Sequence, residues 1–244
     1  MAQHTKHRLH LVAPLAPGDT ETLDAERAHY IVRVLRLRTG DALVVFNGDG
    51  AARAAVLTNS TTKRCQIEIG DIAQRQPAPA FTLALAQALI KGDKLDFVLQ
   101  KATELGATDI RLVTTERTEV AVRDARLERR MHHWQKVMIA AAEQCGRLWL
   151  PTLHEPVSLA QLAESASGQR YLLDPAAEPL AGSPSASDTL VLVGPEGGFS
   201  DPERSHVMDC GFTPMGLGSN VLRADTAPVA ALAILRNSWG WRAP

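Results

Sequence analysis

Two glycine-containing loops carry the residues that are best suited to chemistry. The first is GPEGG, residues 194–198, which lies between the apolar run TLVLV and the sequence FSDPE. TLVLV is typical of a strand buried on both faces, and SDPE predicts a helix start with a capping box and an early proline. GPEGG is therefore predicted to be a strand-to-helix loop whose bare backbone can bind a ligand, although a plain tight turn explains the same residues. It lacks the Lys and Ser/Thr of a P-loop, so triphosphate binding is not expected.

The second loop is GLGSNVLRADTA, residues 216–227. It has two glycines of a dinucleotide fingerprint but Val221 at the third position, which argues against a Rossmann site. Arg223 and Asp225 precede the last expected helix, which suits a compact ligand with apolar and polar parts. Asp225 or Thr226 is equally suited to cap that helix.

The elements that position these loops alternate between strands and helices after residue 80. Such βα units predict an α/β domain with a mostly parallel sheet and a ligand site at the carboxyl ends of its strands. The expected strands are FTLALAQAL, IRLVTT, YLLD, TLVLVG and TPMGLG, and the expected helices include residues 92–106, 123–146 and about 225–239.

The first part of the chain has a different pattern. Residues 42–72 alternate short apolar runs with turn signals, including two Asx-Gly pairs, which predicts a small antiparallel β unit. A helix is expected before it, with Asp24 as its N-cap and Gly40 as its stop. Residues 74–80, QRQPAPA, are typical of a linker.

Composition limits the classes of function. The net charge is −1 and the pI is about 6.7, so a nucleic-acid site would need local clusters of basic residues. Three cysteines without C-x-x-C spacing predict neither a disulfide framework nor a zinc site, and His4, His7, His10 and His29 are too dispersed to predict a metal site. No apolar stretch is long enough for a signal peptide or a membrane span, so we expect a soluble cytoplasmic protein.

One basic cluster is suited to RNA. RVLRLR supplies Arg33, Arg36 and Arg38 without an acid, and the first two are expected to share a helix face. A solvated charged face is the alternative interpretation. Lys91, Lys94 and Lys101 would continue the basic surface along the second domain.

Several blocks together resemble a known family. LVGPEGGFSDPE, LGSNVLRADTA, KGDKLDFVLQKATELG and AAAEQCGR are similar to conserved blocks of the ribosomal RNA small subunit methyltransferase E family, which makes 3-methyluridine. HYIVRVLRLRTGD resembles the start of that family's PUA-like domain. The resemblance covers nearly the whole chain. It implies a small PUA-like β-barrel RNA-binding domain over residues 1–75 and a SPOUT methyltransferase domain over 76–244, with a trefoil knot around 190–235.

The resemblance also implies a cofactor and partners. S-adenosylmethionine would bind in the knot, the protein would form a homodimer through its knotted domain, and the substrate would be 16S ribosomal RNA or the assembled 30S subunit. The implied cofactor-binding residues are Gly194, Glu196, Gly197, Gly198, Leu217, Gly218, Asn220, Val221 and Leu222.

Methylation of uridine N3 requires loss of the N3 proton and stabilisation of charge on O2 and O4. Arg223 is the first candidate for that stabilisation, although it could instead pair with Asp225 or Glu196. Arg147 is the second candidate, and Gln144 could hydrogen-bond a base edge. Glu196 is expected to remove the proton or to orient the substrate.

Two residues depart from the family pattern. Asn220 stands where the family commonly has Lys or Arg, and Asp225 stands where it has Glu. They are the only support for one alternative, an RNA-binding module that has lost catalysis. The other alternative is a transfer RNA methyltransferase of the same superfamily, which would share the loops but differ in RNA docking.

Overall fold

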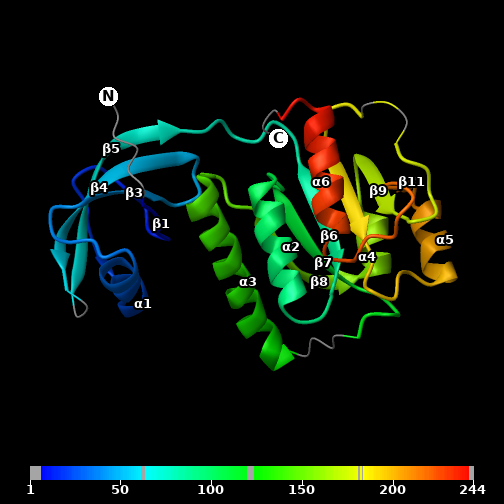
Figure 1. The fold of residues 1–244 in the computed structure, drawn as a ribbon, viewed down its shortest axis with the longest axis horizontal. Helices are drawn as coiled ribbons and strands as arrows, with labels where there is room; N and C mark the ends of the chain where they lie inside the picture. The colour runs from blue at the N-terminus through cyan, green and yellow to red at the C-terminus, as the bar shows by residue number, and fades with distance from the viewer. Residues whose placement is uncertain (1–6, 62–63, 120–123, 181, 183, 242–244) are drawn as a thin grey trace. The chain divides into compact units, whose positions relative to one another are not determined.

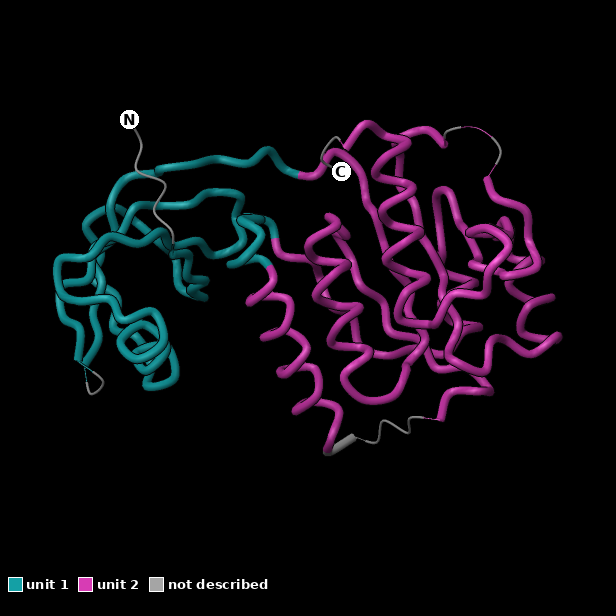
Figure 2. Tube along the Cα trace, in the orientation of Figure 1, with its two compact units in different colours: residues 1–78, 142–149 teal, residues 79–141, 150–244 magenta. Residues whose placement is uncertain are grey.

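The computed structural model describes residues 7–61, 64–119, 124–180, 182 and 184–241 (Figure 1). The chain divides into two compact units, shown in different colours in Figure 2. The N-terminal unit comprises Met1–Ala78 and Ala142–Trp149, and the C-terminal unit comprises Pro79–Ala141 and Leu150–Pro244. The N-terminal unit therefore takes in a later segment that the contiguous division at residue 75 did not include.

The N-terminal unit contains the expected β structure. Its five-stranded sheet has the order β1-β3-β4-β5-β2, in which β3, β4 and β5 pair antiparallel and β1 pairs parallel with β3. Apolar side chains from these strands share one core with Ala28 and Ile31. The strands are β1 (Arg8–His10), β2 (Thr20–Leu23), β3 (Ala42–Phe46), β4 (Ala51–Ser60) and β5 (Cys65–Arg75).

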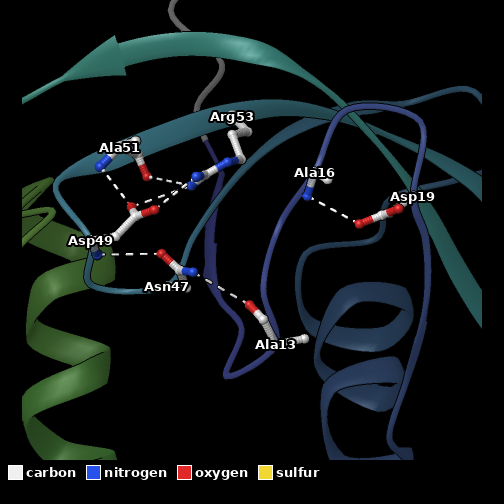
Figure 3. A network of polar contacts seen from close by, with 7 residues as sticks. All are labelled: Ala13, Ala16, Asp19, Asn47, Asp49, Ala51 and Arg53. Atoms are coloured by element: carbon white, nitrogen blue, oxygen red, sulfur yellow. Dashed lines mark hydrogen bonds and ion pairs between the residues drawn. The ribbon is translucent and has the colours of Figure 1, made fainter.

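The turn between β3 and β4 is built from the predicted Asx-Gly pairs (Figure 3). The side chain of Asn47 accepts the N–H of Asp49 at 3.3 Å, and Asp49 accepts the N–H of Ala51 at 2.9 Å. Arg53 Nη2 donates to Asp49 Oδ2 at 2.7 Å and holds the pKa of this carboxyl below its usual value. The turn chemistry read from the sequence is confirmed.

The helix before β3 is shorter than expected. Helix α1 (Ala25–His29) continues as the π-helix η1 (Tyr30–Val34). The side chain of Asp24 accepts the N–H of Arg27 at 2.8 Å, which confirms the predicted N-cap.

The predicted stop at Gly40 is wrong. The turn ends at Leu35, and Arg36 has φ 58°, in the left-handed region. Arg36 lies beyond the end of the helix, so Arg33 and Arg36 do not share the helix face that their spacing predicted. Periodicity could not reveal this because a π-turn and a left-handed residue change the angular spacing of side chains.

The C-terminal unit is the predicted α/β domain. Its six-stranded sheet is parallel throughout and has the order β11-β9-β10-β6-β7-β8. The strands are β6 (Leu83–Ala88), β7 (Asp109–Thr114), β8 (Thr152–Ser158), β9 (Gln169–Leu173), β10 (Thr189–Val193) and β11 (Thr213–Met215). The helices are α2 (Asp93–Glu104), α3 (Asp124–Cys145), α4 (Leu159–Ser165), α5 (Asp201–Asp209) and α6 (Ala227–Ser238).

Helices cover both faces of this sheet. One core joins side chains of α2, α3 and α6 to one face, and another joins α4 and α5 to the opposite face. Leu85 and Ala84, adjacent in β6, contribute to the first and second core respectively, as alternation along a strand requires. Strands β6 and β10 are buried along their whole length. This burial accounts for their unbroken apolar sequences.

Strand β8 and helix α4 were not predicted. Strand β8 has the sequence TLHEPVS, lies at the edge of the sheet and contains a proline. Every residue in it is exposed or partly exposed, so it has none of the apolar pattern by which a strand is recognised. Helix α4 has a capping box at Ser158 but only seven residues. The capping box predicted at Ser200, before α5, is confirmed.

The loop after β9 lies against two later segments of the chain, the start of the second glycine loop and the end of α6. The N–H of Gly216 donates to the carbonyl of Glu178 at 3.0 Å, and Trp239 Nε1 donates to the carbonyl of Pro184 at 3.1 Å. A Cβ atom on Gly216 would overlap the carbonyl oxygen of Ala177. Glycine is therefore required here by the close approach of two backbones.

Two features are absent from the described part of the chain. None of its helices combines the length and the apolar character that a membrane span needs. It also holds no group of three or more His, Cys, Asp or Glu side chains arranged to bind a metal ion.

Glu143, in the N-terminal unit, is partly buried. Its Oε1 accepts the N–H of His10 at 2.8 Å. Burial raises the pKa of Glu143 more than the His10 N–H and the charge of Arg27 lower it. The ionised carboxylate is thus disfavoured in the folded state. The stability that the neutral Glu143 side chain contributes is complete below the pKa of the unfolded state and is lost as the pH rises through the raised pKa of the folded state.

We predict that Glu143→Gln increases the free energy of unfolding at pH 8 relative to the unchanged protein, and that the difference disappears near pH 4, about the ordinary pKa of Glu. Urea unfolding at the two pH values measures this difference. Glu128→Gln, at an exposed position on α3, is the matched control and should show no such dependence. A pH-independent effect of Glu143→Gln would contradict the assignment.

Candidate functional site

A pocket of about 590 Å³ lies at the carboxyl ends of three neighbouring strands in the C-terminal unit. Its walls come mainly from the ends of these strands and the segments that follow them: residues 172–175 for β9, residues 193–196, 198 and 199 for β10, and residues 215, 217, 218 and 220–224 for β11. These strands are parallel, so their carboxyl ends meet at one edge of the sheet and bring the two glycine loops together.

The predicted cofactor-binding residues gather at this pocket. All of them line it except Gly197. The carbonyl of Gly197 instead accepts Arg117 Nη1 at 2.8 Å, which ties the loop to the segment that follows β7.

Glycine is needed at particular points of both loops. Gly198 has φ 67° and Gly218 has φ 111°, values that residues with a side chain rarely adopt. A Cβ atom on Gly194 would lie 3.0 Å from the ring of Phe199. The glycines therefore serve backbone conformation and packing and leave peptide groups accessible to a ligand.

Glu196 forms an ion pair with Lys94, a residue that the sequence analysis predicted to bind RNA. Lys94 Nζ lies 2.9 Å from Glu196 Oε1, and both residues line the pocket. Burial tends to raise the pKa of Glu196, but the Lys94 ammonium and backbone N–H groups, including that of Lys91, outweigh it and lower the pKa. A carboxylate with a lowered pKa is a weaker base, so this geometry favours orientation over proton removal.

Lys91 forms a different ion pair, with Glu119. This carboxylate raises the pKa of the Lys91 ammonium. Both lysines therefore form ion pairs, and Lys94 does so inside the pocket. The prediction that Lys91 and Lys94 bind RNA remains a prediction.

Arg223 lines the pocket and its side chain is exposed. Within the described residues its guanidinium makes no ion pair or hydrogen bond, so it is not paired with Glu196 or Asp225 as the structural alternative proposed. The backbone carbonyl of Arg223 accepts the N–H groups of Thr226 and Ala227, each at 2.9 Å.

The expected side-chain cap of the last helix is absent. Thr226 occupies the N-cap position of α6 without a capping hydrogen bond from its side chain. Thr226 Oγ1 donates to Asp225 Oδ1 at 3.2 Å. The capping role given to Asp225 or Thr226 is therefore wrong, because their side chains bind each other.

Sequence reasoning missed an ion pair in the pocket. Asp174, only 8% exposed, follows β9 and pairs with Arg204 on α5. Both residues line the pocket. Asp174 was recognisable as the carboxylate at the end of the predicted strand YLLD, whereas Arg204 is one of several charged residues on α5 and had no distinguishing signal.

The other predicted site residues belong to the N-terminal unit. Gln144 and Arg147 lie in its segment Ala142–Trp149, and neither lines the pocket. Gln144, Arg33 and Arg36 are exposed, whereas Arg147 is partly exposed. Their roles in catalysis or RNA binding remain predictions.

The pocket combines apolar walls with separate charges of both signs. Leu172, Val193 and Phe199 contribute apolar surface, and Asp174 and Glu196 contribute carboxylates. This arrangement suits a ligand with a flat apolar part and charged groups at its other end.

Comparisons with known protein families give a match in each of the two units. A family profile described as an RNA methyltransferase domain matches residues 76–236, and one described as an RNA methyltransferase PUA domain matches residues 23–70. These matches support the predicted PUA-like N-terminal domain and methyltransferase C-terminal domain.

Two curated relatives carry the same name. The ribosomal RNA small subunit methyltransferase E of Synechocystis is 35% identical, over 88% of this chain and 72% of the relative. The protein of that name from Rickettsia conorii is 31% identical, over 94% of this chain and 95% of the relative.

A solved structure has the same fold. The ribosomal RNA small subunit methyltransferase E of Neisseria gonorrhoeae, bound to S-adenosyl methionine, matches with a TM-score of 0.86 and 31% identity. The match covers 96% of this chain and 98% of the other.

Proposed function

The chain belongs to the ribosomal RNA small subunit methyltransferase E family, and on that premise we propose that it transfers a methyl group from S-adenosylmethionine to N3 of a uridine in small-subunit ribosomal RNA. The product is 3-methyluridine. The observation that carries the proposal is the single pocket formed by the two glycine loops, at the edge of the sheet where α/β proteins bind ligands.

The residues of the pocket fit S-adenosylmethionine. Its adenine needs a flat apolar space and backbone hydrogen bonds, which the apolar walls and bare loops provide. Its amino acid end carries both charges, for which Asp174 and Arg204 are suited as an oppositely charged pair. When bound, S-adenosylmethionine supplies an electrophilic methyl group.

Arg223 is the residue that we assign to charge stabilisation. Negative charge develops on uracil O2 and O4 as N3 loses its proton, and a fixed cation nearby lowers the energy of that state. Arg223 is suited to this role because its guanidinium is not engaged by any described residue, whereas Lys94 is neutralised by Glu196. Glu196, held as a carboxylate, orients ligand groups.

Several further properties complete the proposal. We infer a homodimer through the C-terminal domain, action on the small ribosomal subunit in the cytoplasm, and a trefoil knot around residues 190–235. The knot is supported by the contacts of the loop after β9 with Gly216, at the start of the second glycine loop, and with Trp239, at the end of α6.

The direct test is labelled methyl transfer to small ribosomal subunits that lack 3-methyluridine, followed by nuclease digestion and mass spectrometry of the nucleosides. We expect 3-methyluridine in the small-subunit RNA. Methylation of transfer RNA instead would overturn the substrate, and cofactor binding without transfer to either RNA would indicate a non-catalytic binding module.

We predict that Arg223→Ala lowers the rate of methyl transfer about 100-fold, the usual effect of removing one group that stabilises developing charge. The affinity for S-adenosylmethionine should change by no more than about threefold, less than 1 kcal/mol. Single-turnover transfer and calorimetry measure the two quantities. Arg223→Lys, which keeps the charge, should retain more of the rate; equal losses of rate and affinity in Arg223→Ala would show a structural role.

Gly218→Val is predicted to weaken S-adenosylmethionine binding about tenfold or more, or 1.4 kcal/mol. Gly218 lines the pocket and has φ 111°, so a branched side chain would both strain the loop and add bulk at the pocket. Gly40→Val is the matched control, because Gly40 has φ 94° and open surroundings in the N-terminal unit. Unchanged affinity in Gly218→Val would refute the placement of this loop at the cofactor.

A further inference from the structure

A second pocket, of about 450 Å³, lies in the C-terminal unit beside the cofactor pocket. One wall is the segment between β6 and the first turn of α2, which includes Leu89, Ile90 and Lys91. The opposite wall comes from Arg130, His133 and Trp134 of α3. The pocket thus has apolar surface, an aromatic ring and charged groups, a combination that suits a nucleobase with its attached phosphate.

The two pockets adjoin at the first turn of α2. Strands β6 and β10 are parallel neighbours, with Gln87 opposite Val193, so the loops that follow them emerge side by side. Lys94, which pairs with Glu196, lines the cofactor pocket, whereas its chain neighbours Asp93 and Leu95 line the second pocket. A ligand in the second pocket would therefore lie next to a ligand in the first.

The second pocket contains a carboxylate and imidazole pair. His133 Nε2 and Asp96 Oδ2 are 2.6 Å apart, and they come from helices α3 and α2. Among the described residues that line either pocket, His133 is the one imidazole. Asp96 holds Nε2, which leaves Nδ1 as the nitrogen able to accept a proton, and imidazole exchanges protons readily near neutral pH.

We propose that the second pocket binds the uracil to be methylated and that His133, positioned by Asp96, accepts the proton from N3. This inference rests on the proposed function. It assigns the role of proton acceptor to His133. Glu196 is poorly suited to that role because it is paired with Lys94.

The step balances as follows. The N3–H bond breaks and the proton passes to Nδ1 of His133, giving an imidazolium whose charge Asp96 stabilises. The electron pair left on N3 forms the bond to the methyl carbon, and the bond from that carbon to sulfur breaks with its electrons remaining on sulfur. The imidazolium then releases its proton to water.

The test compares His133→Gln with the unchanged full-length protein in single-turnover methyl transfer to small ribosomal subunits that lack 3-methyluridine. We expect the rate to fall about 100-fold or more, the usual contribution of a general base, with S-adenosylmethionine affinity unchanged. His132→Gln is the matched control, since His132 is the exposed neighbour on α3 and does not line the pocket.

Two further readouts separate a chemical role from a structural one. Free imidazole should restore part of the rate of His133→Ala, and the rate of His133→Gln should keep rising with pH where that of the unchanged protein levels off. The other charged groups around the imidazole are Arg130 on α3, Asp93 and Asp96 on α2, and Lys91 and Glu119. They remain in place in each variant.

The outcomes are distinct. If the unchanged protein methylates the subunits and His133→Gln does so at a rate within twofold, with the same pH profile, the inference is overturned and the proposed function stands. A reduced rate in His133→Ala that imidazole does not restore also overturns it. If the unchanged protein forms no 3-methyluridine, the proposed function itself fails.

Discussion

The parallel pairing of β10 with β9 on one side and β6 on the other is the constraint on which both pockets depend. Parallel neighbours end at the same edge of a sheet, so the loops after all three strands must share that edge. Burial of β6 and β10 on both faces holds the edge rigid, because any shift in register would displace side chains from two cores at once. The loops themselves then need only short, glycine-containing sequences to form a binding site.

The charges at this edge follow a simple arrangement. Among the described residues that line the cofactor pocket, two carboxylates are each paired with a cation: Glu196 with Lys94, and Asp174 with Arg204. Arg223 is the remaining charged side chain, and it has no such partner. A paired charge costs less to keep beside an apolar surface than an unpaired one, whereas an unpaired cation is available to an incoming negative charge. The proposed chemistry therefore uses Arg223, the cation without a partner, and not Lys94 or Arg204, which are paired.

Most local sequence signals were reliable, and the cap predicted at Asp225 or Thr226 is the exception. The capping box at Ser200, the N-cap at Asp24 and the turn around Asp49 each join residues within four positions of one another, and all are present. Signals failed where a distant or irregular contact decided the outcome. Arg36 itself has a left-handed conformation and lies beyond the end of the helix, and strand β8 formed at the edge of the sheet without an apolar pattern.

The sequence by itself determined the family, the α/β class of the C-terminal domain and the two loops that line the pocket, because motifs and buried strands are written in contiguous residues. Only the tertiary structure decided the partners of the charged side chains. Lys94 and Glu196 are 102 positions apart, and Asp96 and His133 are 37 apart. Which charges meet across such separations depends on strand order and helix placement, which residue spacing along the chain does not encode.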